Sequence, residues 1–190
     1  MTMLRTNDSF LLYVQKIYEQ QQRKENIIIK HYNPGDRIFL QNEPTSKIML
    51  IKEGITKCYF TENNGKEYIL EFLGQGEVIG EIEYFQKIPC LCTIEALTTV
   101  TTYAFSIPYF QKLIQEDLQL NNLLLFAFSE RIVNTASRAS YQQLYTVEHN
   151  LNKLLEIQKQ QNISISKDDL AAYLGVSIRT LNRGLKNLKP

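Results

Sequence analysis

The 190-residue sequence has no tryptophan, only two histidines and three cysteines, and almost no net charge. Three cysteines, at positions 58, 90 and 92, cannot build a disulfide framework, and their spacing is not that of a zinc ribbon. A net charge of +1 argues against a protein that coats nucleic acid regardless of sequence, so any DNA contact should be local. The sequence has neither an apolar run long enough to span a membrane nor a signal peptide, so we expect a cytoplasmic protein without a membrane partner.

What the chain does contain is enough apolar sequence for a sizeable core. With 44% hydrophobic residues, it can form one main domain and a smaller second one. In residues 1–26, apolar residues at helical spacing predict a short amphipathic helix from Phe10 to Gln22, and a polar linker follows. We expect this helix to cover the domain that follows.

Residues 27–116 have the pattern of a β domain. Short apolar runs separated by glycine-containing turns replace the helical periodicity, and a short helix follows at Tyr109 to Ile114. Asn63-Asn64-Gly65 lies between two of these runs, and Asn-Gly supplies the positive φ angles that a tight hairpin requires. About eight strands of this kind predict a double-sheet jelly roll. The predicted strands are Ile27–Tyr32, Arg37–Leu40, Lys47–Lys52, Ile55–Phe60, Glu67–Phe72, a patch near Val78, Leu91–Ala96 and Val100–Phe105.

A long helix is predicted over residues 117–140, because apolar residues recur there at steps of three and four. Its apolar stripe is wider than packing on one domain requires, so we expect it to pair with a second copy and form a two-fold dimer. Packing on the parent domain alone is the other interpretation. Another helix should follow from about Gln142 to Gln160, with a hinge near Ser137 to Ser140. The stripe comprises Leu118, Leu125, Phe128, Ile132 and Ala139, widened by Leu120, Leu124 and Ala127.

Within residues 141–190, the last stretch has the local signals of two short helices joined by a tight turn. Ser166 can cap the first helix, and Asp169 three residues later suits its positive end. Gly175 can end it in the left-handed conformation, and Ser177 can cap the second helix. The residues expected to face inward are Leu170, Ala171, Leu174, Leu181, Leu185 and Leu188.

The other face of the second helix has side chains that suit DNA. Arginine can make a bidentate contact with guanine, and asparagine with adenine, in the major groove. We expect Arg179, Asn182 and Arg183 to read bases and Lys186 to contact phosphate, although an ordinary helical hairpin with a solvated basic face would show the same pattern. The predicted DNA-binding residues are Ser177, Ile178, Arg179, Asn182, Arg183 and Lys186, and Lys189 extends the basic face.

This order of parts resembles the CRP/FNR (cyclic-AMP receptor protein and fumarate-nitrate regulator) family of bacterial transcription regulators. The matching segments are Tyr32-Asn33-Pro34-Gly35-Asp36, Ile51-Lys52-Glu53-Gly54, Leu73 to Glu81 and Leu170 to Ser177. The resemblance implies an α+β fold: a double-stranded β-helix of the cyclic-nucleotide-binding type, a dimerisation helix and a C-terminal helix-turn-helix of the winged type. It also implies a homodimer acting on pseudo-palindromic double-stranded DNA, with a small-molecule effector and RNA polymerase as further partners.

The resemblance also indicates where an effector would bind. Family members that bind cyclic nucleotides use a Gly-Glu pair, matched by Gly80 and Glu81, and then an Arg-Ser or Arg-Thr pair. Cys90 and Leu91 stand in place of the second pair, with Cys92 following. A phosphate in a partly buried pocket needs a bidentate cation or comparable donors, which these residues lack. We therefore expect an effector pocket at these five positions that does not take cyclic AMP.

No cofactor and no enzymatic activity are expected. Iron-sulfur members of the family carry cysteines near the N-terminus, and this chain has none before Cys58. Cys90 and Cys92 are spaced so that they can be oxidised or bind a soft metal, although alternating cysteines on a strand are more often small apolar residues. His31 and His149 are isolated, unlike the clustered histidines of jelly-roll metalloenzymes, and no nucleophile-base pair stands out.

The end of the chain departs from the family pattern. Family members usually continue past the recognition helix into a β-hairpin wing, whereas this sequence stops at Pro190. The sequence thus predicts that the wing is absent or truncated, which would remove phosphate contacts. An effector-binding or protein-interaction module that has lost DNA binding is the alternative function.

Overall fold

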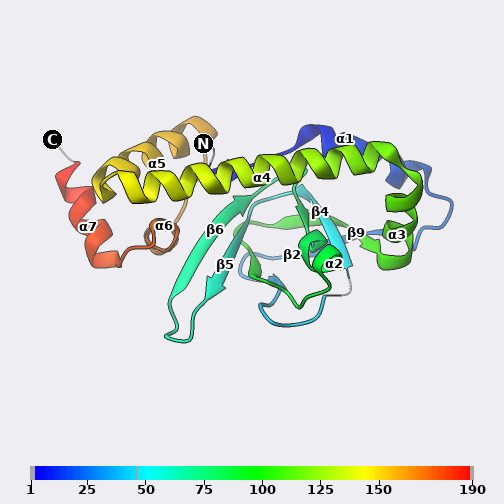
Figure 1. The fold of residues 1–190 in the computed structure, drawn as a ribbon, viewed down its shortest axis with the longest axis horizontal. Helices are drawn as coiled ribbons and strands as arrows, with labels where there is room; N and C mark the ends of the chain where they lie inside the picture. Colours follow the sequence, from blue (N-terminus) through cyan, green and yellow to red (C-terminus); the bar gives the residue numbers. More distant parts are fainter. Residues whose placement is uncertain (1–2, 46, 189–190) are drawn as a thin grey trace.

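The computed structural model describes residues 3–45 and 47–188. A jelly roll occupies the centre, a long helix runs along it, and the C-terminal helices gather at one end (Figure 1). In chain order the elements are β1 (Leu4–Arg5), α1 (Asp8–Gln20), β2 (Ile27–Tyr32), β3 (Arg37–Phe39), β4 (Lys47–Glu53), β5 (Thr56–Thr61), β6 (Glu67–Leu73), β7 (Val78–Ile79), α2 (Glu81–Gln86), β8 (Thr93–Ala96), β9 (Val100–Ser106), α3 (Ile107–Glu116), α4 (Leu118–Leu144), α5 (Val147–Gln161), α6 (Lys167–Leu174) and α7 (Ile178–Asn187).

The predicted jelly roll is confirmed. One sheet has the strand order β1-β6-β5-β8-β3 and the other β2-β9-β4-β7. The Asn63-Asn64-Gly65 hairpin joins β5 to β6, with Gly65 at φ +74° and the Glu62 amide donating to the Lys66 carbonyl at 2.9 Å. Two short elements were not predicted from the sequence: strand β1, which pairs in parallel with β6, and helix α2.

The jelly roll supports two cores, because side chains alternate between the faces of a strand. On β4, Ile48 and Leu50 face helices α1, α3 and α4, whereas Met49 and Ile51 face the opposite sheet. A third cluster, here called the shared core, joins β1, β5 and β6 to α5, α6 and α7. Its members include Met3, Tyr59, Ile69, Phe72, Leu151, Leu154, Tyr173 and Leu181. The helices at the end of the molecule are therefore packed directly on the five-stranded sheet.

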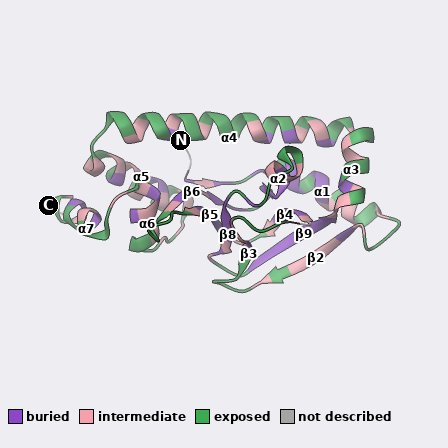
Figure 2. Ribbon diagram, turned by 60° about the horizontal axis from the view of Figure 1, so that its bottom comes forward, coloured by how far each residue is buried: buried purple, intermediate pink, exposed green. Residues whose placement is uncertain are grey.

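Helix α4 is longer than predicted, and this corrects the position of the hinge. Residues 137–140 lie inside one continuous helix that ends at Leu144, and the break comes at Tyr145 and Thr146. Arg138 accounts for the difference, because its buried guanidinium bonds carbonyls of β6 and α6 and holds this turn in place. The outward face of α4 remains exposed along most of its length (Figure 2). Among the described residues, no helix combines the length and apolarity needed to cross a membrane.

Candidate functional site

The two C-terminal helices have the caps that the sequence indicated. The Ser166 hydroxyl accepts from the Asp169 amide at 3.0 Å, and Ser177 accepts from the Thr180 amide at 3.1 Å. Gly175 ends α6 at φ +68°, a left-handed conformation that glycine adopts without strain. These local interactions set the sharp turn between α6 and α7.

The inward face of α7 fixes the helix against α5. Leu181 is fully buried, and Gly184 faces Leu151, whose Cδ2 would lie only 3.2 Å from an added Cβ. Leu185 and Leu188 are partly buried in the shared core. A side chain at position 184 would therefore require Leu151 to shift by a few tenths of an ångström.

The outward face of α7 carries the predicted DNA-binding residues. Ser177, Ile178, Arg179, Asn182, Arg183 and Lys186 are all exposed. Within residues 3–45 and 47–188, no hydrogen bond or ion pair engages the side chains of Arg179, Asn182, Arg183 or Lys186. Lys189 and the expected position of the wing lie outside the described residues. The structure thus gathers the six residues on one open basic surface.

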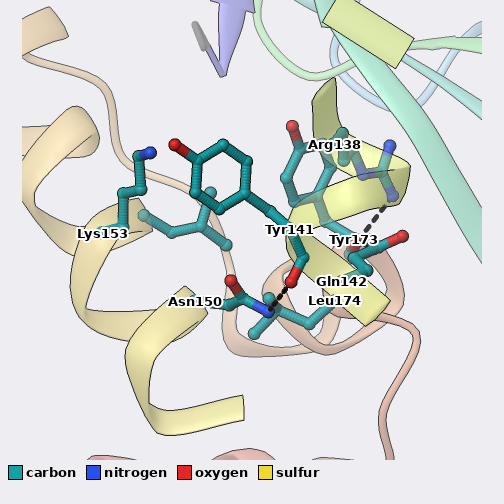
Figure 3. A pocket seen from close by; sticks show the side chains of 8 residues that line it. Arg138, Tyr141, Gln142, Asn150, Lys153, Tyr173 and Leu174 are labelled. Carbon is teal, nitrogen blue, oxygen red and sulfur yellow. Dashed lines mark hydrogen bonds between the residues drawn. The ribbon is translucent and has the colours of Figure 1, made fainter. Parts of the chain in front are cut away.

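Arg138 connects the long helix, the jelly roll and the helix-turn-helix. Its side chain is 6% exposed, and its guanidinium donates to the carbonyls of Leu70, Ile69 (2.7 Å) and Tyr173 (2.6 Å). The guanidinium also lies 3.9 Å from the centre of the Tyr173 ring. Figure 3 shows Arg138 and Tyr173 together, beside a cavity of about 20 Å³ that has room for roughly one water molecule.

A second polar contact holds α6 on the sheet. Lys57 of β5 places its Nζ 3.0 Å from Asp169 Oδ1 and 3.2 Å from Glu95 Oε1. Burial lowers the pKa of Lys57, but Asp169 and Glu95 outweigh that effect and raise it overall. Lys57 therefore stays charged and ties the first helix of the pair to the jelly roll.

The predicted effector pocket contains a buried ionic cluster. Glu81 is 1% exposed and pairs with Arg131 of α4, whose guanidinium also lies 3.4 Å from Glu71 and 3.7 Å from Glu77. Arg5 completes the cluster at 3.2 Å from both Glu71 and Glu77. Three carboxyl groups thus face two guanidinium groups. Arg5, Glu71, Glu77 and Arg131 were not predicted from the sequence, although Leu124, Arg131 and Arg138 recur every seven residues on the buried side of α4.

The charges in this cluster oppose one another. Burial raises the pKa of Glu81 and of Glu77, although the neighbouring guanidinium groups lower it. Burial would lower the pKa of Arg131, but the three carboxylates outweigh it and raise that pKa. Glu77 Oε2 makes no hydrogen bond despite its ion pairs. The carboxyl groups of Glu77 and Glu81 are therefore easier to protonate than that of an exposed glutamate.

The space left around this cluster is small. The cavity measures about 60 Å³, whereas ligand pockets are typically about 300 to 1,000 Å³. Gly80, Glu81, Leu91 and Cys92 line it, with Arg131 on the α4 side. Cys90 lies apart from them and lines a separate surface hollow beside Arg37 and Lys47. The structure therefore brings together four of the five predicted pocket residues.

All three cysteines are buried, and the reactive thiolate is disfavoured at Cys58 and Cys90. Cys58, rather than Cys90, is the neighbour of Cys92: hydrogen bonding with Cys92 and then burial raise the pKa of Cys58. Burial raises the pKa of Cys90 to about 11. In the described part of the chain, no three histidine, cysteine or acidic side chains are grouped as metal ligands would be.

The outward face of α4 carries large apolar side chains that remain exposed in the part of the chain that the structure describes. Five of its large apolar side chains are each more than half exposed: Leu118, Leu125, Phe126, Ile132 and Val133. Leu118, Leu125 and Ile132 repeat every seven residues, the spacing of a coiled-coil seam. Phe128 and Ala127, by contrast, face the jelly roll. The stripe predicted from the sequence is thus divided between the parent domain and an open face.

Comparison with known proteins agrees with this architecture. A model of the cyclic nucleotide-binding domain family matches residues 29–117. The chain is 25% identical over 157 residues to a probable transcriptional regulator, flp, of Lacticaseibacillus casei, covering 80% of this chain and 72% of that protein. It is 24% identical over 172 residues to the cAMP-activated global transcriptional regulator CRP of Salmonella typhimurium, covering 85% and 82%.

A solved structure gives the same fold. The c-di-GMP-responsive global regulator CLP of Xanthomonas campestris superposes with a TM-score of 0.78 at 20% identity, over 86% of this chain and 87% of that one. The jelly roll, the long helix and the C-terminal helix pair thus occur together in these regulators and in this structure. Residues 29–117 belong to the cyclic nucleotide-binding domain family, and the chain as a whole is similar in sequence and fold to transcription regulators of the CRP/FNR type.

Proposed function

We propose that this chain is a sequence-specific DNA-binding transcription regulator that acts as a homodimer on a pseudo-palindromic site. The observation that carries the proposal is the outward face of α7, where Arg179, Asn182, Arg183 and Lys186 are exposed and have no partners within the described residues. A helix held on its apolar side and open on a basic side has the form required to enter the major groove. Arg179, Asn182 and Arg183 would read bases, and Lys186 would contact phosphate.

The exposed apolar face of α4 supports the dimer. Residues that repeat every seven positions and are mostly exposed in one copy can be buried by the same residues of a second copy. Such pairing would give the two α7 helices a two-fold relationship. The two halves of the DNA site would then lie about one helical turn apart.

The pocket supports an effector other than cyclic AMP, or none. Cys90 and Leu91 supply no cation where a phosphate would need one, and Glu81 is already paired with Arg131. The remaining cavity of about 60 Å³ is far smaller than a nucleotide pocket. The jelly roll would then influence DNA binding through its contacts with α4 and α6, and RNA polymerase would be the partner at the promoter.

Selection of bound fragments from a randomised duplex library tests this function. Enrichment of a two-fold-symmetric motif is the expected result. At the selected site, Arg183→Ala should cost about 1 to 3 kcal/mol and relax specificity at one base pair, whereas Lys186→Ala should weaken all sequences alike. Equal, sequence-blind losses in both variants would contradict the assigned roles. If no motif is enriched, the chain is better described as an interaction module.

A further inference from the structure

Strand β1 lies between the jelly roll and the DNA-binding helices and contacts both. On one side, Leu4 and Arg5 pair with Phe72 and Leu73 of β6. On the other side, the Gln161 side chain at the end of α5 accepts from the Leu4 amide at 3.0 Å and donates to the Leu4 carbonyl at 2.8 Å. One amide side chain therefore pairs with the outer edge of β1 as a neighbouring strand would.

Apolar packing strengthens the same connection. Met3 is 1% exposed and belongs to the shared core, together with Leu151 and Leu154 of α5 and Tyr173 of α6. The segment Met3–Arg5, held by Gln161, is called the strap below. It is anchored in the core of the helices as well as in the hydrogen-bond ladder of the sheet.

The loop after β6 is shaped to let the strap pass. The Gly74 amide donates to the Arg5 carbonyl at 2.8 Å, and the Asn7 amide donates to the Gln75 carbonyl at 2.9 Å. A Cβ on Gly76 would lie 1.8 Å from the Asn7 carbonyl oxygen, so only glycine fits at that position. The glycines of this loop therefore have a structural role independent of any ligand.

We propose that Gln161 is a positioning residue for DNA binding, which acts by fixing the strap against α5 and so holding α7 in a set orientation to α4. The inference rests on the proposed function, because it concerns how two recognition helices of a dimer meet two half-sites. A dimer gains affinity from its second helix only if both helices reach their half-sites together. If the strap no longer contacts α5, helices α6 and α7 of each copy can adopt a wider range of orientations. The second α7 helix then adds less affinity.

The test compares Gln161→Ala with Gln160→Ala, a matched variant of the neighbouring exposed residue. Binding is measured to a duplex with both selected half-sites and to a duplex with one. Gln161→Ala should weaken binding to the full site about fivefold to tenfold and change binding to the half-site less than about twofold. Gln161→Glu keeps the oxygen that accepts from the Leu4 amide and loses the group that donates to the Leu4 carbonyl. Its affinity for the full site should therefore lie between that of Gln161→Ala and that of the unmodified protein. Gln160→Ala should match the unmodified protein on both duplexes.

A second measurement needs no DNA. Hydrogen exchange at the amides of α6 and α7 should become about tenfold faster in Gln161→Ala, while β4 and β9 keep their protection. The proposal would be overturned if Gln161→Ala lost the same factor of affinity for both duplexes. It would also be overturned if this variant kept both its hydrogen-exchange rates and its affinity for the full site. If the unmodified protein binds neither duplex, the proposed function fails. The exchange comparison still decides whether the strap holds the helices.

Discussion

Replacing Arg138 with alanine should destabilise the whole protein, because this side chain joins three parts of it. The substitution removes charge-assisted hydrogen bonds to the carbonyls of Ile69, Leu70 and Tyr173 and leaves space beside the Tyr173 ring. Each bond of this kind contributes about 1.5 to 3 kcal/mol, and loss of the buried charge offsets part of the total. We expect the free energy of unfolding to fall by about 3 to 4 kcal/mol.

Urea denaturation followed by far-ultraviolet circular dichroism measures this change. In a chain of this length, the same loss should lower Tm by about 6 to 16 °C. Arg138→Met keeps much of the packing and should lose less, which separates the hydrogen bonds from the cavity. Arg179→Ala, on an exposed arginine, should stay within about 0.5 kcal/mol of the unmodified protein. A loss below about 1 kcal/mol in Arg138→Ala would refute the view that Arg138 holds the parts together.

Two further predictions concern the pocket. Burial raises the pKa of Glu77 above the ordinary 4.5, so the stability that this group contributes is present at low pH and is lost as pH rises through the raised value. Glu77→Gln should therefore lose less free energy of unfolding than the unmodified protein as the pH is raised above 4.5, as measured by denaturation at each pH. A steeper decline in the variant would show that Glu77 is ionised and well paired. Isothermal titration should detect no micromolar binding of cyclic AMP, since the guanidinium that lines the pocket, that of Arg131, is already paired with Glu71, Glu77 and Glu81. A heat of binding that saturates in that range would show that other donors replace it.

The features that the sequence predicts closely are those determined by residues near one another in the sequence. Ser166, Gly175 and Ser177 define the helix-turn-helix through local caps and a left-handed turn, so its boundaries were found closely. The β5–β6 hairpin follows from Asn64-Gly65 in the same way. These signals depend on a few adjacent residues and not on the rest of the fold.

The features that were missed or misplaced depend on distant residues. The ionic cluster joins positions 5, 71, 77, 81 and 131, and no local pattern connects them. Strand β1 has two residues and is stabilised by β6 and Gln161, which are remote in sequence. The predicted hinge at residues 137–140 lies inside α4, because Arg138 stabilises this part of the helix through tertiary contacts with β6 and α6.

The shared core also bears on how regulators of this kind can be recombined. A chimera that joins this jelly roll to the DNA-binding helices of a relative would naturally be cut at the break at Tyr145 and Thr146. That cut places Phe72 and Tyr173, whose rings lie 5.4 Å apart, in parts from different proteins. Met3 would then pack against the side chains of the relative instead of those of this chain. A working chimera would therefore need matched residues on β1 and β6 as well as the new helices. Under the proposed function, changing the outward face of α7 would alter DNA specificity and leave the shared core intact, whereas replacing the domain would not.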